Sequence, residues 1–521
     1  MRTAVSALLL LLSVGQFSAA RPGYTGTDAP RRRRIPLGRR STPLFISPAA
    51  LPGIPTADAV AALDDPLDTD NIQSDILVGQ QKNKELFFFF KVNDAATFKA
   101  KLASDIIPLI TTTTEVLSED TQPVTAVNLA FSNTGLVALG VDDELGDPDF
   151  VAGQFSEATS VGDDPSTWNP AFAGTNIHGV FLLASDTVDN LNAELASIQS
   201  ILGSSVTELY SLQGAARPGD EEGHEHFGFM DGISQPAITG FTTPVHPGQI
   251  PRLFLLGEDG DPNLSARPGW AKDGAFLVFR QLQQLVPEFN QFLQENAVDQ
   301  DTLTPEQGSD LLGARMVGRW KSGAPVFLSP THDDPVLAAD PDRNNDFTYL
   351  IADALPDPGT ENHFNQTNCP FGAHIRKVHP RGDLSDGADE QLHFIIRSSI
   401  PYGPEVTSAE TASATSTIDR GLAFVAYQAS IGNGFVFLQN VWINNNGFPF
   451  GKVDPTPGVD PIIGTGIDAL FGLTGGPQNI SGMDPANPAL DIVRPETYVV
   501  SRGGEYFFSP SLSGLDHIAA A

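Results

Sequence analysis

The sequence predicts an α+β fold rather than a doubly wound parallel one. Short apolar runs that suit strands are interleaved with stretches whose apolar residues recur at helical spacing. No predicted strand is followed by a glycine-rich loop of the dinucleotide-binding type, and the letters show no internal repeat. The chain of 521 residues is long enough to bury a large core.

The first half is expected to begin ordered structure near Asn71. The run 85–91, Glu-Leu-Phe-Phe-Phe-Phe-Lys, is too short for a helix and suits a strand buried on both faces. Residues 94–109 follow with the apolar spacing of an amphipathic helix. The remaining elements expected here are strands at 128–131 and 179–183, a helix at 188–202 capped by Asp186 or Thr187, and a strand at 275–279 that closes this half.

The second half shows the same alternation of predicted strands and helices. A helix is expected at 288–296 after Pro287, strands at 393–397 and 422–427, and a helix beginning with 435–439. We therefore divide the ordered chain into halves at 71–280 and 281–521, preceded by an irregular lead-in at 41–70 that is rich in Pro, Ala and Asp.

The first forty residues predict secretion. Arg2 precedes an apolar run at 4–14 that is too short to span a bilayer, and small residues at 18–20 offer a cleavage point. We interpret 1–20 as a signal peptide and 21–40 as a basic propeptide cut after Arg40; a solvated basic arm is the alternative. No later stretch is long and apolar enough to predict a membrane anchor, so an extracellular protein is expected.

The charge of the chain excludes whole classes of partner. Removing 1–40 takes away eight Arg and one Asp, which leaves 22 Lys and Arg against 62 Asp and Glu, a formal charge of −40. Such a surface repels nucleic acid and anionic membranes. It also favours work at acidic pH, where protonation of carboxylates relieves self-repulsion.

The cysteine count and the glycosylation signals agree with a secreted chain that is not stabilised by an intrachain disulfide. Cys369 is the one cysteine, so an intrachain disulfide is impossible. Three acceptor triplets for N-glycosylation begin at Asn263, Asn365 and Asn479.

Two segments carry residues suited to chemistry. The first, Glu225-His-Phe-Gly-Phe-Met-Asp-Gly-Ile-Ser-Gln-Pro, holds Asp231 next to a glycine, where the backbone can turn sharply and a bulky ligand can approach. The second is Cys369-Pro-Phe-Gly-Ala-His-Ile-Arg-Lys-Val-His-Pro-Arg, followed by Arg397 in Ile-Ile-Arg-Ser-Ser-Ile-Pro-Tyr-Gly-Pro-Glu. From residue type alone Asp231 suits a turn aspartate and His374 a core histidine as well as a functional group.

These segments together resemble the fungal dye-decolourising peroxidases. Gly-Phe-Met-Asp-Gly, His-Ile-Arg, Arg-Ser-Ser-Ile-Pro-Tyr-Gly-Pro-Glu, Gly-Leu-Ala-Phe-Val-Ala-Tyr-Gln and the ending Ser501-Arg-Gly-Gly-Glu-Tyr-Phe-Phe-Ser-Pro-Ser occur in that family's order. The resemblance runs from about Asn71 to the C-terminus. It implies two ferredoxin-like halves with antiparallel sheets and surrounding helices, and haem b bound mainly by the C-terminal half.

On the proximal side of the haem, the resemblance implies that His374 is the iron ligand. Its partner for a hydrogen bond from the other ring nitrogen matches Asp460, and such a bond makes the imidazole a stronger donor. Arg376 would pair with a haem propionate, unless it is an ordinary surface arginine.

On the distal side, the resemblance implies Asp231 as acid and base toward hydrogen peroxide, and Arg397 as the cation that stabilises charge on the breaking O–O bond. Leu422 and Phe424 match apolar residues of the distal channel, although their alternation also suits a buried strand. Tyr402 and Trp442 match an aromatic pair that oxidises bulky dyes and aromatic reductants away from the haem; packing is the alternative for both. The asparagine run after Trp442 predicts that this side chain reaches solvent.

Other readings remain open at this stage. A thiolate ligand at Cys369 is conceivable, but a buried thiol suits it better. His379 is expected in a loop before Pro380, off the face of His374. A haem carrier without turnover would need His374 but not both Asp231 and Arg397. A metal-dependent hydrolase could use Asp231 with His224 and His226, for which no third histidine or cysteine stands nearby.

Overall fold

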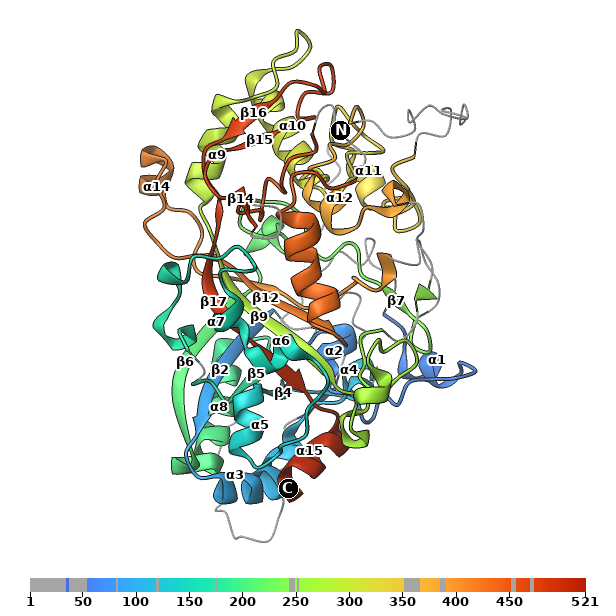
Figure 1. Cartoon of the computed structure of the whole chain (residues 1–521), viewed down its shortest axis with the longest axis vertical. Coiled ribbons are helices and arrows are strands. Elements are labelled where there is room, and N and C mark those ends of the chain that lie inside the picture. The colour runs from blue at the N-terminus through green and yellow to red at the C-terminus, as the bar shows by residue number, and fades with distance from the viewer. Residues whose placement is uncertain are drawn as a thin grey trace, which may run out of the picture.

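A ring of eight antiparallel strands lies at the centre of the computed structural model (Figure 1). The structure describes residues 34–36, 54–80, 83–118, 121–174, 176–242, 249–250, 253–350, 366–384, 390–450, 456–468 and 473–521. The predicted signal peptide lies outside these residues, as does the propeptide except for β1 (Arg34–Pro36), which pairs with β3 (Thr121–Pro123). Among the described residues, no helix is long and apolar enough to cross a membrane.

The first half of the ring has ferredoxin-like topology. Its strands are β2 (Lys84–Val92), β4 (Thr125–Phe131), β5 (Gly179–Ser185) and β6 (Val206–Ala215), in the spatial order β6-β2-β5-β4. Two helical crossovers connect them: α3 (Ala95–Lys101), which continues as π and 3₁₀ turns to Leu109, and α8 (Val188–Leu202). The Asp94 and Thr187 side chains cap these helices by accepting hydrogen bonds from Thr97 and Asn190 N–H.

The second half repeats this topology. Its strands are β9 (Ala275–Gln284), β11 (Ile400–Tyr402), β12 (Gly421–Gln428) and β17 (Val499–Ser509), in the order β11-β12-β9-β17. The two sheets meet where β4 pairs with β17 and β6 with β11, which closes the ring. The predicted α+β fold with two ferredoxin-like halves is therefore confirmed. The strand expected to close the first half is instead the first strand of the second, and the boundary expected at 280 falls inside it.

The two faces of the ring bury separate apolar clusters. Alternate side chains of β2 point to opposite faces, as strand geometry requires. Phe87 and Phe89 lie inside the ring, where Phe89 meets Phe279 of the opposite wall with ring centroids 4.8 Å apart. Phe88 and Phe90 lie on the outer face, under the helices that include α3 and α8. The run of four phenylalanines is thus buried on both faces, as predicted.

Long connections of the second half build a separate upper region (Figure 1). They contain α9 (Val286–Glu295), α10 (Pro305–Val317), α11 (Pro335–Ala338), α12 (His374–Val378) and α14 (Ser408–Ser413). The strand expected at 393–397 is reduced to β10 (Ile396–Arg397). The helix expected from 435 onward is largely π-helical, in η10 (Gly432–Val436) and η11 (Leu438–Ile443).

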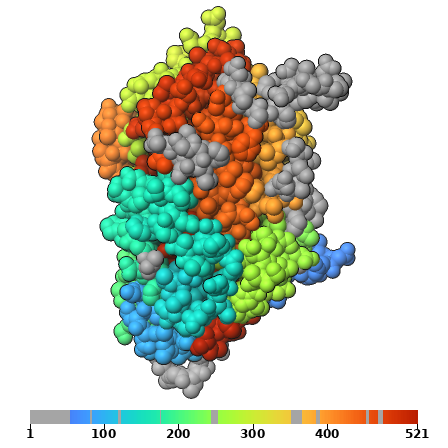
Figure 2. All heavy atoms as spheres, viewed as in Figure 1, coloured from blue at the N-terminus to red at the C-terminus, as the bar shows by residue number. Residues whose placement is uncertain are grey.

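Shorter elements complete the chain. In Figure 2 the blue to teal surface of the first half adjoins the orange and red surface of the second without a break in this view. The C-terminal α15 (Leu512–Ala520) lies beside α3 at the foot of the molecule (Figure 1). The other helices are α1 (Ala57–Ala61), which lies in the lead-in expected to be irregular, α2 (Ser74–Val78), α4 (Thr113–Leu117), α5 (Asn133–Ala138), α6 (Pro148–Ala152) and α7 (Gln154–Glu157). Short strand pairs are β7 (Ala237–Ile238) with β8 (Gln249–Ile250), β13 (Ile467–Asp468) with β14 (Leu473–Thr474), and β15 (Gln478–Ile480) with β16 (Ile492–Arg494).

Candidate active site

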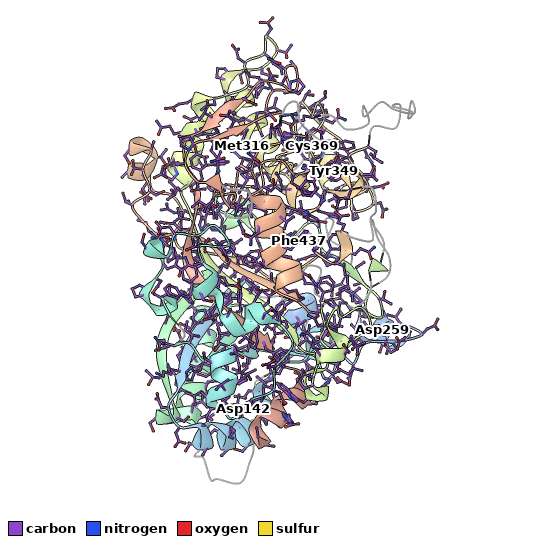
Figure 3. The ribbon with its side chains drawn as sticks, in the orientation of Figure 1. Asp142, Asp259, Met316, Tyr349, Cys369 and Phe437 are labelled. Atoms are coloured by element: carbon purple, nitrogen blue, oxygen red, sulfur yellow. The ribbon has the colours of Figure 1, made fainter. Side chains whose placement is uncertain are left out.

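A cavity of about 310 Å³ lies between the outer face of β9 and β12 and the helices of the upper region. Its walls come from the 225–236 loop, both strands, α12 and its C-terminal continuation, and the π-helical segment 432–443. Figure 3 shows Tyr349 above the helix that carries Phe437; Tyr349 is one of the lining residues. Asp231, His374 and Arg397, which are far apart in the sequence, all line this one space.

Asp231 and Arg397 form an ion pair at the cavity wall. Arg397 donates from Nη1 to Asp231 Oδ1 over 2.6 Å, and Gly232 N–H donates to the same oxygen. Gly232 has φ of +75°, a conformation that glycine adopts without strain, so the glycine lets the backbone amide turn back onto the carboxylate. Gln235 fixes the other partner, because its side-chain amide exchanges two hydrogen bonds with the backbone of Arg397.

The ion pair decides the charge of Asp231. Burial raises the pKa of the Asp231 carboxyl, but the charge and hydrogen bond of Arg397 outweigh it, so the pKa lies below its usual value. Asp231 is therefore an anion at neutral and mildly acidic pH. An anionic carboxylate beside a fixed guanidinium can accept a proton and can stabilise a neighbouring polarised bond.

His374 stands at the first position of α12. Its Nδ1 lies 2.7 Å from Asp460 Oδ2, and Asp460 is itself held by N–H groups of Ile462 and Ile463. Burial lowers the pKa of His374, but the Asp460 charge and hydrogen bond outweigh it and raise the pKa above its usual value. Since Nδ1 is engaged with the carboxylate, Nε2 is the ring nitrogen available to bind a metal. The pair predicted from the sequence is thus in hydrogen-bond contact.

Leu422 and Phe424 both line the cavity, as the same-face residues of β12. The outer face of the sheet therefore presents these apolar side chains to the same space as the ionic groups.

The structure overturns the expected position of Arg376. This side chain does not line the cavity: it is fully buried, and its Nε and Nη2 bind both oxygens of Asp383 at 2.5 and 2.8 Å. Its guanidinium also lies over the ring of Tyr349, 4.6 Å from the centroid. Because α12 is a short helix, a residue two positions after His374 points away from the face that His374 presents. Arg376 is a structural cation, not one available to a ligand.

Three other cationic side chains, which the sequence reasoning missed, line the cavity instead. Arg280 donates from Nη2 to both oxygens of Asp163, and within the described residues its buried Nη1 has no partner. Arg319 and Arg381 bind carbonyl and amide oxygens of neutral residues, and no described carboxylate forms a salt bridge with either. Only Arg381, at the end of the quoted His374 motif, carried a sequence signal.

His379 also lines the cavity. It is the C-terminal cap of α12, in the loop predicted before Pro380, but it faces the same space as His374 because the chain changes direction there. Burial lowers its pKa well below the usual value, so the ring is neutral.

Trp442 and Tyr402 are both buried, which contradicts the expectation that Trp442 reaches solvent. Trp442 is 2% exposed and stacks on Phe448 with ring centroids 5.0 Å apart. On its other side it meets His393, a cavity-lining residue, at 5.2 Å. Tyr402 does not line the cavity, and its hydroxyl donates to Asp419 Oδ1 over 2.8 Å. The asparagine run failed as a solvent signal because its first two members, Asn444 and Asn445, are themselves buried and its exposed part begins at Asn446.

The remaining candidates take no part in the cavity chemistry. Cys369 is buried outside the cavity, and burial raises the pKa of its thiol to about 11, so it is a neutral thiol as expected. His224 and His226 each contact a different backbone carbonyl, of Lys321 and Tyr402. Over the part of the chain that the structure describes, no group of three or more His, Cys, Asp or Glu side chains could hold a metal ion.

Comparison with known proteins gives concordant matches along the chain. Residues 71–218 match a family model described as a DyP dimeric alpha+beta barrel domain, and residues 316–449 match one described as the C-terminal part of Dyp-type peroxidases. The chain is 70% identical over 537 aligned positions to a dye-decolorizing peroxidase of Mycena epipterygia, with all of both chains covered. It is 51% identical to a dye-decolorizing peroxidase of Auricularia auricula-judae, covering 95% of this chain and 96% of the other. A crystal structure of a fungal DyP-type peroxidase from Auricularia auricula-judae superposes with a TM-score of 0.81 at 52% identity, covering 87% of this chain and 99% of the other.

Proposed function

The chain belongs to the dye-decolorizing peroxidase family, and we propose that it holds haem b between His374 and the Asp231–Arg397 pair to oxidise bulky aromatic reductants with hydrogen peroxide. One observation carries the proposal: a single cavity is lined by an imidazole backed by a carboxylate and by a carboxylate paired with an arginine. A haem carrier needs the imidazole but has no use for the second pair.

The lining of the cavity fits a haem. Apolar side chains such as Leu422, Phe424 and Ile463 suit a flat aromatic macrocycle, and His374 Nε2 suits its iron. Donors without a partner among the described residues, Arg280 Nη1 and Arg381 Nε, suit carboxylates at its edge. When bound, haem supplies iron that accepts electrons from organic reductants and passes them to peroxide.

His374 and Asp460 form the proximal side in this proposal. The carboxylate accepts a hydrogen bond from Nδ1–H, which fixes the tautomer and orientation of the ring and leaves Nε2 as the ligand atom. The two backbone N–H groups on Asp460 Oδ1 hold the carboxylate in place as an anion.

Asp231 and Arg397 form the distal side. Asp231, an anion at the working pH, takes a proton from hydrogen peroxide and returns one to the oxygen that leaves as water. The Arg397 guanidinium stabilises the negative charge that develops as the O–O bond breaks. Leu422 and Phe424 limit the room beside this pair to small molecules.

Arg319 and Arg381 replace Arg376 as the propionate-binding cations. Both are buried in the cavity wall with neutral partners, so a bound carboxylate would compensate charges that were costly to bury. Burial lowers the pKa of Arg319 to about 9, and the nearby charge of Arg381 adds to the effect.

Electrons from reductants too large for the cavity enter through aromatic side chains. Trp442 touches His393 of the cavity wall on one side and Phe448 on the other, and Phe448 contacts the exposed Phe450. This stack of rings is a route between the surface and the cavity. Tyr402 offers a second oxidisable ring, with Asp419 in place to accept its phenolic proton.

The experiment that tests the proposal joins an absorption spectrum with a dye-bleaching assay on the purified protein. Ferric haem bands together with peroxide-dependent bleaching are expected. Haem bands without bleaching would indicate a carrier, and bleaching without haem bands would refute the site.

Secretion and acidic operation complete the proposal. The basic segment 31–40 and the acidic balance of the remaining chain support an extracellular enzyme released by cleavage after Arg40. Sequencing the N-terminus of protein recovered from a secreting host should therefore give Ser41. An N-terminus at Arg21 would show that the basic segment persists.

A further inference from the structure

A smaller space of about 120 Å³ adjoins the cavity at Asp231 and Arg397, whose side chains line both. We call this space the side channel. Away from the ion pair its lining is largely apolar but includes Gln80, Glu85 at the start of β2, and Ser398. Glu85 is 7% exposed, on the face of β2 that also carries Phe87, so a carboxyl group is buried where the channel meets the inside of the ring.

Behind the channel wall lies a second buried carboxylate, Asp75 of α2. Its Oδ1 accepts a hydrogen bond from Ser398 Oγ over 2.8 Å, and its Oδ2 accepts one from Tyr427 Oη over 2.6 Å. Ser398 directly follows Arg397 in the chain. Asp75 therefore holds the channel wall next to the distal arginine.

The channel also contains a polar group that needs a ligand. Gln80 is 2% exposed, and its Oε1 accepts a hydrogen bond from Ser74 Oγ over 2.9 Å. Its Nε2 is buried without any partner among the described residues. A buried amide N–H without a partner costs free energy, which a water molecule in the channel would recover. The side channel is thus suited to ordered water between Glu85 and Asp231.

The reduction of hydrogen peroxide consumes protons at the distal site, and such a water chain would deliver them. Reducing one hydrogen peroxide to two waters consumes two electrons and two protons. When the electrons come from a bulky reductant at the surface, the protons it loses are released there, so the two protons must reach the distal site by another way.

We propose that Glu85 relays these protons from solvent through the side channel to Asp231, with Asp75 and Gln80 as positioning residues. Glu85 gives its carboxyl proton to the channel water, the water passes a proton to Asp231, and a proton from solvent restores Glu85. The proposal rests on the distal role assigned to Asp231.

The surroundings of Glu85 keep its carboxyl group protonated. Burial, and then the charge of Asp75, raise the pKa of Glu85 well above its usual value, so Glu85 keeps a proton where Asp231 has lost its own. The other titratable groups along the channel are His224, Glu225 and Arg397, and Tyr427 lies behind it with Asp75. Glu85 therefore still carries a proton at pH values where Asp231 is an anion. Because Glu85 has the higher pKa, proton transfer to Asp231 is uphill in the resting pair, and it is completed when Asp231 passes its proton to the reacting oxygen.

The first test compares Glu85→Gln with the wild type and with Asp231→Asn. Glu85→Gln should load haem and react with peroxide at the wild-type rate, while steady-state turnover of a bulky dye falls by about tenfold or more and its solvent isotope effect rises. Asp231→Asn should instead slow the reaction with peroxide itself, so failure of the distal assignment is distinguishable from failure of the relay. Unchanged dye turnover and isotope effect in Glu85→Gln would overturn the relay.

Glu505 supplies a matched control. It is another buried glutamate, and burial raises its pKa to about 7, but it lies on β17 and lines neither the channel nor the cavity. Glu505→Gln should leave dye turnover unchanged. An equal loss in both variants would assign the effect to a buried glutamate in general and refute the relay.

Infrared spectroscopy gives a readout that does not depend on turnover. The difference spectrum of wild type minus Glu85→Gln should contain a protonated carboxyl stretch near neutral pH, because the stretches of other buried carboxyl groups such as Glu505 are common to both proteins and cancel. In Asp75→Asn this component should titrate at lower pH, because that substitution removes the charge that raises the pKa of Glu85. The alkaline limb of dye turnover should move to lower pH in Asp75→Asn by the same amount. A carboxyl band unaffected by either substitution would refute the assignment.

Discussion

The two halves of the ring share one topology but cover their outer faces differently. In the first half, the connection from β2 to β4 occupies residues 93–124, and its helices pack directly on Phe88 and Phe90. In the second half, the equivalent connection from β9 to β11 occupies 285–399, and the corresponding outer face carries Arg280, Leu422 and Phe424 toward a cavity. The ferredoxin-like topology alone therefore does not make the site; the long connection does, because it holds α12 and its histidine away from the sheet.

The polar content of the strands differs in the same way. The described residues of β4 and β5 are all buried and almost all apolar, whereas β9 brings Arg280 and Gln284 to the cavity. Burying an arginine is costly unless it has partners, and Asp163 offsets part of that cost for Arg280. The first half therefore buries mainly apolar side chains, which stabilise the fold. The second half also buries polar and charged side chains that serve the site at a cost in stability.

Among the substitutions that test this difference, His374→Ala should have the largest effect. The cavity should lose its iron ligand while the ring remains folded, because His374 lies on α12 and not on a strand of the ring. We expect folded protein with little haem, measured by the haem absorbance per protein and by circular dichroism. Full haem content with an unchanged spectrum would contradict the assignment. His379→Ala is an informative comparison, because a residue that lines the cavity without binding iron should reduce haem retention less.

Asp231→Asn should have the next largest effect. An amide cannot take the peroxide proton, so the rate of reaction with peroxide should fall by about 10²–10⁴-fold while haem stays bound. In the wild type, the lowered pKa keeps Asp231 ionised, so this rate should fall only when the pH drops below the usual carboxyl value of 3.8. Stopped-flow spectroscopy across pH measures both. Arg397→Leu is the partner variant: it should also slow the reaction and should move the acid limb to higher pH, because the cation that lowers the pKa is gone.

A substitution in the first half should lower the stability of the protein without changing its chemistry. Phe90 is fully buried and packs against Phe98 and Phe181, with ring centroids 5.7 and 5.3 Å away. Phe90→Ala should lower the free energy of unfolding by about 3–5 kcal/mol, while the folded enzyme keeps its haem spectrum and its rate with peroxide. Denaturant unfolding measures the first and stopped-flow the second. The half-exposed Val137, replaced by Ala, should change stability by no more than about 0.5 kcal/mol.

The smallest effect is expected from Trp442→Phe. Phenylalanine keeps the stack on Phe448 but gives up an electron less readily, so turnover of large dyes should fall several-fold while small phenols are oxidised normally. Steady-state kinetics on both classes measures this. Equal losses on both would indicate that the ring serves packing. Loss in Tyr402→Phe but not in Trp442→Phe would assign the route to Tyr402.

Much of this could be predicted from the sequence. The α+β class follows from apolar runs too short for helices between stretches of helical spacing, as at 85–91 and 188–202. The set of motifs indicated the family, and through it four site residues. In the structure His374, Asp231 and Arg397 line one cavity, and Asp460 is hydrogen-bonded to His374. Their roles remain predictions for the experiments above.

Other features depended on tertiary structure. Periodicity gives the faces of an element but not which element lies opposite, so the strand at 275–279 was assigned to the wrong half. The direction of Arg376 depends on the turn after α12, which brings Asp383, seven residues further along the chain, back to its guanidinium. The burial of Trp442 depends on His393 and Phe448, whose rings meet it only in the fold. Arg319 and Glu85 carry no local signal, because their significance lies in facing a cavity or channel. Local patterns determine the elements and the chemical types of side chain, whereas contacts between distant segments decide which charges are neutralised and which are left available for chemistry.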